Sequence, residues 1–115
     1  MHLLVHVLEQ TERLAELLEG FAEAGVTGTT VVDSIGMGRI LVESGADVPA
    51  MQTIKSVLAK GKATNKTVFA VVQDEDTLQK AIEVVRSLCG DLHAPGQGIL
   101  FTLRLDLVEG LKKIR

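Results

Sequence analysis

Two glycine-rich segments hold the residues whose types and spacing best suit binding chemistry. The first, Gly36-Met37-Gly38-Arg39, ends a β-branched run that begins at Thr27, and the second is Gly96-Gln97-Gly98. Glycine lacks a Cβ atom, so such segments let backbone N–H groups approach a phosphate closely, and an arginine adds a charge-assisted hydrogen bond. Both segments also fit an ordinary bulge or turn, because isolated glycine motifs are frequent. At this point both interpretations remain open.

The histidines and the single cysteine do not form a recognisable metal or catalytic set. His2 and His6 stand four residues apart in one apolar run, and His93 lies far along the chain. No further Cys, Asp or close His completes a zinc-type ligand set, so we predict no metal site. Cys89 fits a buried small residue. Because the sequence offers no acid/base pair, activated nucleophile or P-loop, we predict that the protein is not an enzyme.

The bulk composition narrows the class of protein. A chain of 115 residues with 46% hydrophobic residues predicts a single globular domain spanning 1–115. Only 3% of the residues are aromatic and the formal net charge is -3, which argues against nucleic acid as a partner. The absence of a basic leader, of an internal cysteine pair and of a long apolar run predicts a cytoplasmic protein.

The hydrophobic pattern predicts alternating strands and helices. Short apolar or β-branched runs predict strands at 2–8, 26–34, 67–73 and 99–105. Apolar residues at helical spacing predict two amphipathic helices, at 11–25 with Thr11 as the N-cap and at 74–90. Between them, residues 40–65 read as a long excursion with a short helix from Pro49 to Lys60, and no helix is expected directly behind Gly36.

The order β-α-β, excursion, β-α-β predicts a ferredoxin-like α+β fold. Its four-stranded antiparallel sheet carries both helices on one face. Apolar residues occur at both parities of the strands, as Leu3, Val5 and Val7 against Leu4 and Leu8 illustrate. Since two helices cover only one face, we infer an oligomer in which the other sheet faces meet.

The chain resembles the nitrogen regulatory PII signalling superfamily. The resemblance rests on the split βαβ plan, on Thr27-Gly28-Thr29-Thr30-Val31 followed by Gly36-Met37-Gly38-Arg39, on the long segment behind them, and on Pro95-Gly96-Gln97-Gly98-Ile99. It covers nearly the whole chain, and the second-strand motif is its most specific part. The resemblance implies a homotrimer with ligand clefts between subunits and a long loop that meets a partner protein.

The resemblance also assigns roles to individual residues. Thr30, Gly36, Met37, Gly38 and Arg39 would line one wall of a cleft that takes an adenine nucleotide such as ATP or ADP. Gly96, Gln97 and Gly98 would line the other wall. The regulated partner would be a protein such as a membrane transporter or an enzyme.

Three departures from the family pattern support an alternative. Ile99 stands where the nucleotide-binding members have a lysine, the chain after Leu105 lacks their arginine pair, and no tyrosine is available for modification. An interaction protein of the same fold with a degenerate cleft is therefore the alternative, beside a metal-binding trimer.

The 49–60 helix is the predicted partner-binding element. Met51, Ile54 and Leu58 form its apolar stripe and Lys55 flanks it. The stripe suits packing on the domain or on a neighbouring subunit, and it equally suits docking on a partner protein or an anionic membrane surface.

Overall fold

The computed structural model describes residues 1–60 and 64–111, and of Lys60 only the backbone. The elements in chain order are β1 His2–Leu8, a 3-10 turn η1 Thr11–Arg13, α1 Leu14–Ala24, β2 Gly28–Ser34, α2 Met37–Glu43, α3 Met51–Lys60, β3 Asn65–Val72, α4 Glu75–Cys89 and β4 Ile99–Arg104.

 Strand β3 alternates buried and less buried residues from Val68 to Val72, as expected for a strand with one face on a core, whereas β1 is buried at three successive positions, 4–6.

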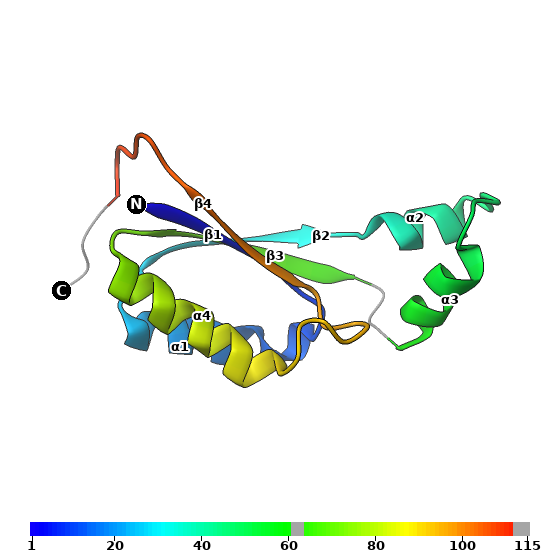
Figure 1. Ribbon diagram of the computed structural model, residues 1–115, viewed down its shortest axis with the longest axis horizontal. Helices are drawn as coiled ribbons and strands as arrows, with labels where there is room; N and C mark the ends of the chain where they lie inside the picture. Colours follow the sequence, from blue (N-terminus) through cyan, green and yellow to red (C-terminus); the bar gives the residue numbers. More distant parts are fainter. Residues whose placement is uncertain (61–63, 112–115) are drawn as a thin grey trace.

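The four strands form one antiparallel sheet in the order β2-β3-β1-β4. Helices α1 and α4 lie together across one face of this sheet (Figure 1). The ferredoxin-like α+β fold and its two helices on one face are thus confirmed. Among the described residues, the longest and most apolar helices still fall short of what crossing a membrane requires.

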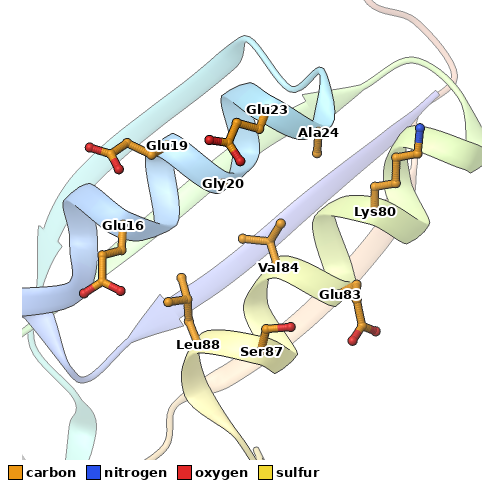
Figure 2. Close-up of a pocket in the computed structure, with 10 residues that line it drawn as sticks. All are labelled: Glu16, Glu19, Gly20, Glu23, Ala24, Lys80, Glu83, Val84, Ser87 and Leu88. Carbon is orange, nitrogen blue, oxygen red and sulfur yellow. The ribbon is translucent and has the colours of Figure 1, made fainter.

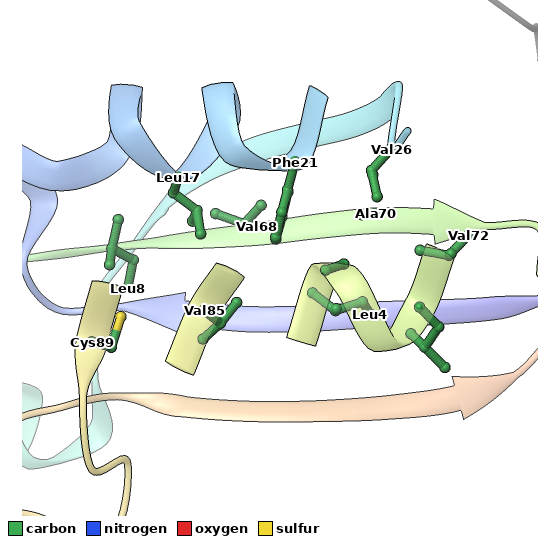
Figure 3. Close-up of a cluster of buried hydrophobic side chains, with 12 residues drawn as sticks. Leu4, Leu8, Leu17, Phe21, Val26, Val68, Ala70, Val72, Val85 and Cys89 are labelled. Atoms are coloured by element: carbon green, nitrogen blue, oxygen red, sulfur yellow. The ribbon is translucent and has the colours of Figure 1, made fainter. Parts of the chain in front are cut away.

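The core lies between the sheet and these two helices (Figure 3). Leu4 and Leu8 on β1 and Val68, Ala70 and Val72 on β3 point toward the helices, and the register pairs Leu4 with Ala70. The helices contribute residues at helical spacing: Leu17 and Phe21 from α1, and Leu78, Ala81, Val85 and Cys89 from α4. The predicted stripes of both helices therefore supply the core.

The helix ends show which sequence signals were correct. Gly25 ends α1 in the left-handed region at φ +99°, and its N–H bonds back to the last turn. Asp74 caps α4, because its carboxylate accepts a hydrogen bond from the Thr77 N–H at 2.8 Å. The prediction of Thr11 as an N-cap is wrong: Thr11 begins the 3-10 turn, and α1 itself starts at Leu14 without a side-chain cap.

Among residues 1–60 and 64–111, no helix lies on the opposite face of the sheet, and Leu111 approaches it at Gly28, where a Cβ would lie 2.8 Å from its Cδ1 atom. The register places these residues of the four described strands on that face, and none of them is charged: Leu3, Val5, Val7, Gly28, Thr30, Val32, Ser34, Asn65, Thr67, Phe69, Val71, Ile99, Phe101 and Leu103. We call it the bare face. Ile99, Phe101 and Leu103 on edge strand β4 are 54%, 44% and 48% exposed. So much exposed apolar surface is typical of an interface.

The excursion at 40–65 differs from its prediction. Helix α2 begins at Met37, directly behind Gly36, so the expectation that no helix follows the glycine motif is wrong. Helix α3 begins at Met51, and Pro49 precedes it. Together α2, α3 and their connection form an arm, residues 37–60, that projects past one end of the sheet (Figure 1). Residues 61–63 of the excursion lie outside the described part of the chain.

Helix α2 forms despite Gly38 because tertiary contacts hold it. A Cβ on Gly38 would lie 2.9 Å from Cγ2 of Ile54, so glycine permits α2 and α3 to pack closely. Arg39 and Glu43 add an ion pair of 2.9 Å one helical turn apart. Propensity alone disfavours a helix here, since each interior glycine costs about 1 kcal/mol relative to alanine.

Candidate functional site

A cavity of about 260 Å³ lies where the arm meets the body of the protein. It is lined by residues from the end of β1, the start of α2, the length of α3 and the start of β3: Glu9, Gly36, Gly38, Arg39, Thr53, Ile54, Val57, Leu58 and Asn65. We call it the arm cavity. Its wall on α3 is apolar, whereas the opposite side carries a carboxylate and an amide.

The arm cavity contains part of the first predicted ligand wall. Gly36, Gly38 and Arg39 line it. Thr30 and Met37 do not: Thr30 pairs with Phe69 in the middle of the bare face, and Met37 is 73% exposed. Gly38 lies inside α2 and permits the close packing of α2 on α3, a structural role that differs from the bulge or turn predicted as the alternative to ligand binding.

The second glycine segment lies beside the cavity and does not line it. A Cβ on Gly98 would lie 1.9 Å from the carbonyl oxygen of Val7 and 3.6 Å from Cγ of Glu9. The neighbouring Gln97 accepts a hydrogen bond of 3.0 Å from the Gln10 side chain. Glu9 thus lines the arm cavity and also lies next to Gly98. Within one chain, the two glycine segments approach the same residue.

Gly98 also lines a separate hollow of about 760 Å³, whose lining shares no residue with that of the arm cavity. Arg86 and His93 border this hollow, together with Asp91. Asp91 is engaged locally, since its carboxylate accepts a hydrogen bond from the His93 N–H at 2.9 Å. The second predicted wall therefore faces a different space from the first within a single chain.

The polar side of the arm cavity centres on Glu9 and Asn65. Burial raises the pKa of the Glu9 carboxyl, and a hydrogen bond with Asn65 partly offsets this effect. Asn65 is 7% exposed and bonds the Ser34 hydroxyl, which in turn lies 2.7 Å from the Thr67 hydroxyl. This network holds the ends of β2 and β3 together beneath the cavity.

The cationic group of the cavity is already engaged. Arg39 is the cavity's cation, and its guanidinium pairs with Glu43 at 2.9 Å. The cavity can therefore enclose an apolar body against Ile54, Val57 and Leu58 and meet polar groups at Glu9 and Asn65. An anion there would have to compete with Glu43 for Arg39.

The predicted partner-binding residues divide between two surfaces. Ile54 and Leu58 line the arm cavity, so in this arrangement they face the inside of the arm. Lys55 is exposed, and it borders the α2–α3 connection together with Met51. A partner that meets the arm as it stands would contact Lys55 rather than Ile54 or Leu58.

A comparison of the sequence with protein-family models found no match, and a comparison with curated protein sequences found none either. The argument for function therefore rests on the residues themselves.

Sequence reasoning missed Glu9 and Asn65. Their signal was the strand register: Leu8 pairs with Lys66, so the next residues of the antiparallel ladder, Glu9 and Asn65, become neighbours. Thr53 was likewise passed over, because it is polar and lies beside the apolar stripe of α3. For metal, no group of three or more suitable side chains occurs within residues 1–60 and 64–111.

The groove between α1 and α4 is a poorer candidate for an anionic ligand (Figure 2). Its volume is about 580 Å³, and four glutamates border it: Glu16, Glu19, Glu23 and Glu83. Lys80, the cation on its rim, pairs with Asp76 at 3.2 Å. None of the predicted ligand residues lines this groove.

Proposed function

We propose that this chain is a PII-like signalling protein that binds a small ligand, an adenine nucleotide such as ATP or ADP or a related anion, and acts on a partner protein through the arm. The observation that carries the proposal is the arm cavity. Predicted ligand residues Gly36, Gly38 and Arg39 line it together with Ile54 and Leu58 of the predicted partner-binding helix. A ligand held there contacts body and arm at once, so its binding free energy biases the position of the arm.

The proposal includes a homotrimer. The uncharged bare face supports it, because side chains such as Phe101 gain stability when a second copy removes them from water. Gly96, Gln97 and Gly98 lie outside the arm cavity of their own chain. In the trimer, the arm cavity of one subunit would form one wall of the ligand cleft, and this glycine segment of a neighbouring subunit would form the other. We place the protein in the cytoplasm.

The first test is a thermal-shift screen with ATP, ADP and AMP, each with and without magnesium. A ligand at 100 times its Kd stabilises the folded state by about 2.7 kcal/mol. Arg39→Ala is expected to abolish the shift. Lys80→Ala, which removes an equally charged side chain on α4, is the matched control and should retain it. A chain that melts identically with every nucleotide would refute the ligand part of the proposal.

The second test is the oligomeric state by light scattering. The wild-type chain is expected to have the mass of a trimer, and Phe101→Asp is expected to lower that mass because it puts a charge on the bare face. Gln79→Asp places the same charge on the exposed side of α4 and should leave the mass unchanged. A wild-type monomer would contradict the trimer.

A second candidate function is an interaction protein with a degenerate cleft. Two features favour it: Glu9 puts a carboxylate in the arm cavity, and Glu43 already occupies Arg39. Such a protein would show no nucleotide-dependent shift and would hold its partner constitutively. Lys55→Glu would then weaken partner capture, whereas Lys80→Glu would not.

A further inference from the structure

His6 is a buried polar residue that the proposed function does not use. It lies on the helix-facing side of β1 and is 0% exposed. Its Nδ1 atom lies 3.1 Å from the carbonyl oxygen of Ile99, and its Nε2 atom lies 3.6 Å from Sγ of Cys89. Both ring nitrogens therefore have a partner.

These contacts determine the form of the ring. A carbonyl oxygen only accepts, so Nδ1 carries the hydrogen and donates it to Ile99. Nε2 then bears a lone pair that accepts the S–H hydrogen of Cys89. The neutral imidazole with its hydrogen on Nδ1 satisfies both neighbours without placing a charge in the core.

The two partners stand at opposite ends of one loop. Cys89 is the last residue of α4, directly before Gly90, and Ile99 is the first residue of β4, directly behind Gly98. Cys89 lies at the end of α4 against the β1 strand (Figure 3). A single imidazole thus bonds both ends of the Gly90–Gly98 loop, which carries Gly96 and Gln97.

Burial of the His6 ring disfavours a positive charge on it more than the hydrogen bond to the Ile99 carbonyl favours one. The register places Val68 of β3 and Leu100 of β4 on either side of it. From α4 it faces the Cys89 thiol. The Arg13 guanidinium acts on that thiol in the opposite sense to burial, and it donates to the Leu88 carbonyl and pairs with Glu16. Burial lowers the pKa of His6 and raises the pKa of Cys89, so both groups are neutral.

We infer that the neutral His6 ring clamps the two ends of the Gly90–Gly98 loop through Ile99 and Cys89, and that protonation of the ring releases the loop. A proton on Nε2 removes the lone pair that accepts from Cys89 and leaves only the weakly accepting sulfur as a partner, and it places a charge on a ring that is 0% exposed. The clamp requires no ligand and holds whether or not a nucleotide binds.

The first experiment determines the tautomer of His6 in the wild-type chain by ¹⁵N NMR at neutral pH. We expect hydrogen on Nδ1 and a bare Nε2. A ring with its hydrogen on Nε2 would overturn the inference without any variant.

The second experiment measures amide exchange of residues 90–98, corrected for the intrinsic effect of pH, as the pH is lowered from 7.5. We expect loop opening to increase about tenfold in the acid range, as for the loss of one hydrogen bond. His6→Gln keeps a donor for Ile99 and does not titrate, so the increase should vanish. His93→Gln, the control on the exposed histidine of the loop, should retain it.

Cys89 provides an independent check should His6→Gln fail to fold. Cys89→Ser keeps a donor for Nε2 and should preserve protection of the loop at neutral pH, whereas Cys89→Ala removes the donor and should increase opening at Gly90 and Asp91. Equal exchange in the serine and alanine variants would contradict the clamp, as would an acid response of His6→Gln equal to that of the wild type.

Discussion

Gly98 and Gly96 provide the sharpest test of how the second glycine segment packs. Both have positive φ, +83° and +78°, so alanine is strained at either position. They differ in their surroundings: a Cβ at Gly98 would lie 1.9 Å from the Val7 carbonyl oxygen, whereas a Cβ at Gly96 meets nothing within 4 Å. The pair therefore separates backbone conformation from close approach.

The expected magnitudes follow from this difference. Gly96→Ala should cost about 1 kcal/mol, the usual penalty for alanine in the left-handed region. Gly98→Ala carries the same penalty and must also push the loop away from β1, which adds overpacking strain of about 1–3 kcal/mol. It additionally disturbs the hydrogen bond between Gln97 and Gln10. We expect a total near 3 kcal/mol.

Urea unfolding at matched protein concentration measures both variants. The midpoint should fall much further for Gly98→Ala than for Gly96→Ala, with the same dependence of the unfolding free energy on urea in both. Equal losses would show that Gly98 does not lie against Val7, and the placement of the whole loop beside Glu9 would be refuted.

Four further predictions concern the stability of the folded chain. Asp74→Ala should lower the free energy of unfolding by about 1 kcal/mol because the Thr77 N–H loses its cap, and Asp74→Asn, which retains a side-chain acceptor, should lose less in the same urea titration. Gly20→Ala should destabilise the α1–α4 contact, since its Cβ would lie 2.6 Å from Cγ1 of Val84; Val84→Ala in the same chain should recover part of the loss, and additive losses would contradict the contact. Stability should fall as the pH drops below 6.5, because the unfolded chain protonates His6 while its pKa in the folded state is lowered. Conversely, the Glu9 pKa is raised above 4.5 in the folded state, so the ionised carboxylate destabilises the fold above that pH. Glu9→Gln should therefore increase stability near pH 7, and an unchanged or lower melting temperature would contradict the burial of Glu9.

The sheet and helices α1 and α4 were predictable because their apolar residues recur at clear helical or strand spacing. The stripes of α1 and α4 and the alternation of β3 follow directly from which residues face a common core. The parity of Val5 and Val7 against Leu4 and Leu8 likewise indicated a second apolar face.

Helix α2 was not predictable because its stability comes from outside its own seven residues. Gly38 lowers its helix propensity, and the compensating contact with Ile54 comes from a helix that starts after the turn. A local pattern contains neither the contact nor its strength.

The candidate site was predictable only in part for a similar reason. The glycine motif indicated Gly36, Gly38 and Arg39, but Glu9 and Asn65 become neighbours only through the pairing of β1 with β3. The burial of Asn65 and the burial that raises the pKa of Glu9 arise from the folded arrangement, and neither is visible in a linear sequence.

The central claim is that a ligand in the arm cavity sets the position of the arm relative to the body. The most direct measurement is the distance between spin labels on Ser56 of α3 and Gln79 of α4, both exposed, in a chain that carries Cys89→Ser. We predict that ATP shifts this distance distribution and that Arg39→Ala removes the shift. A distribution unchanged by a nucleotide that demonstrably binds would contradict the claim.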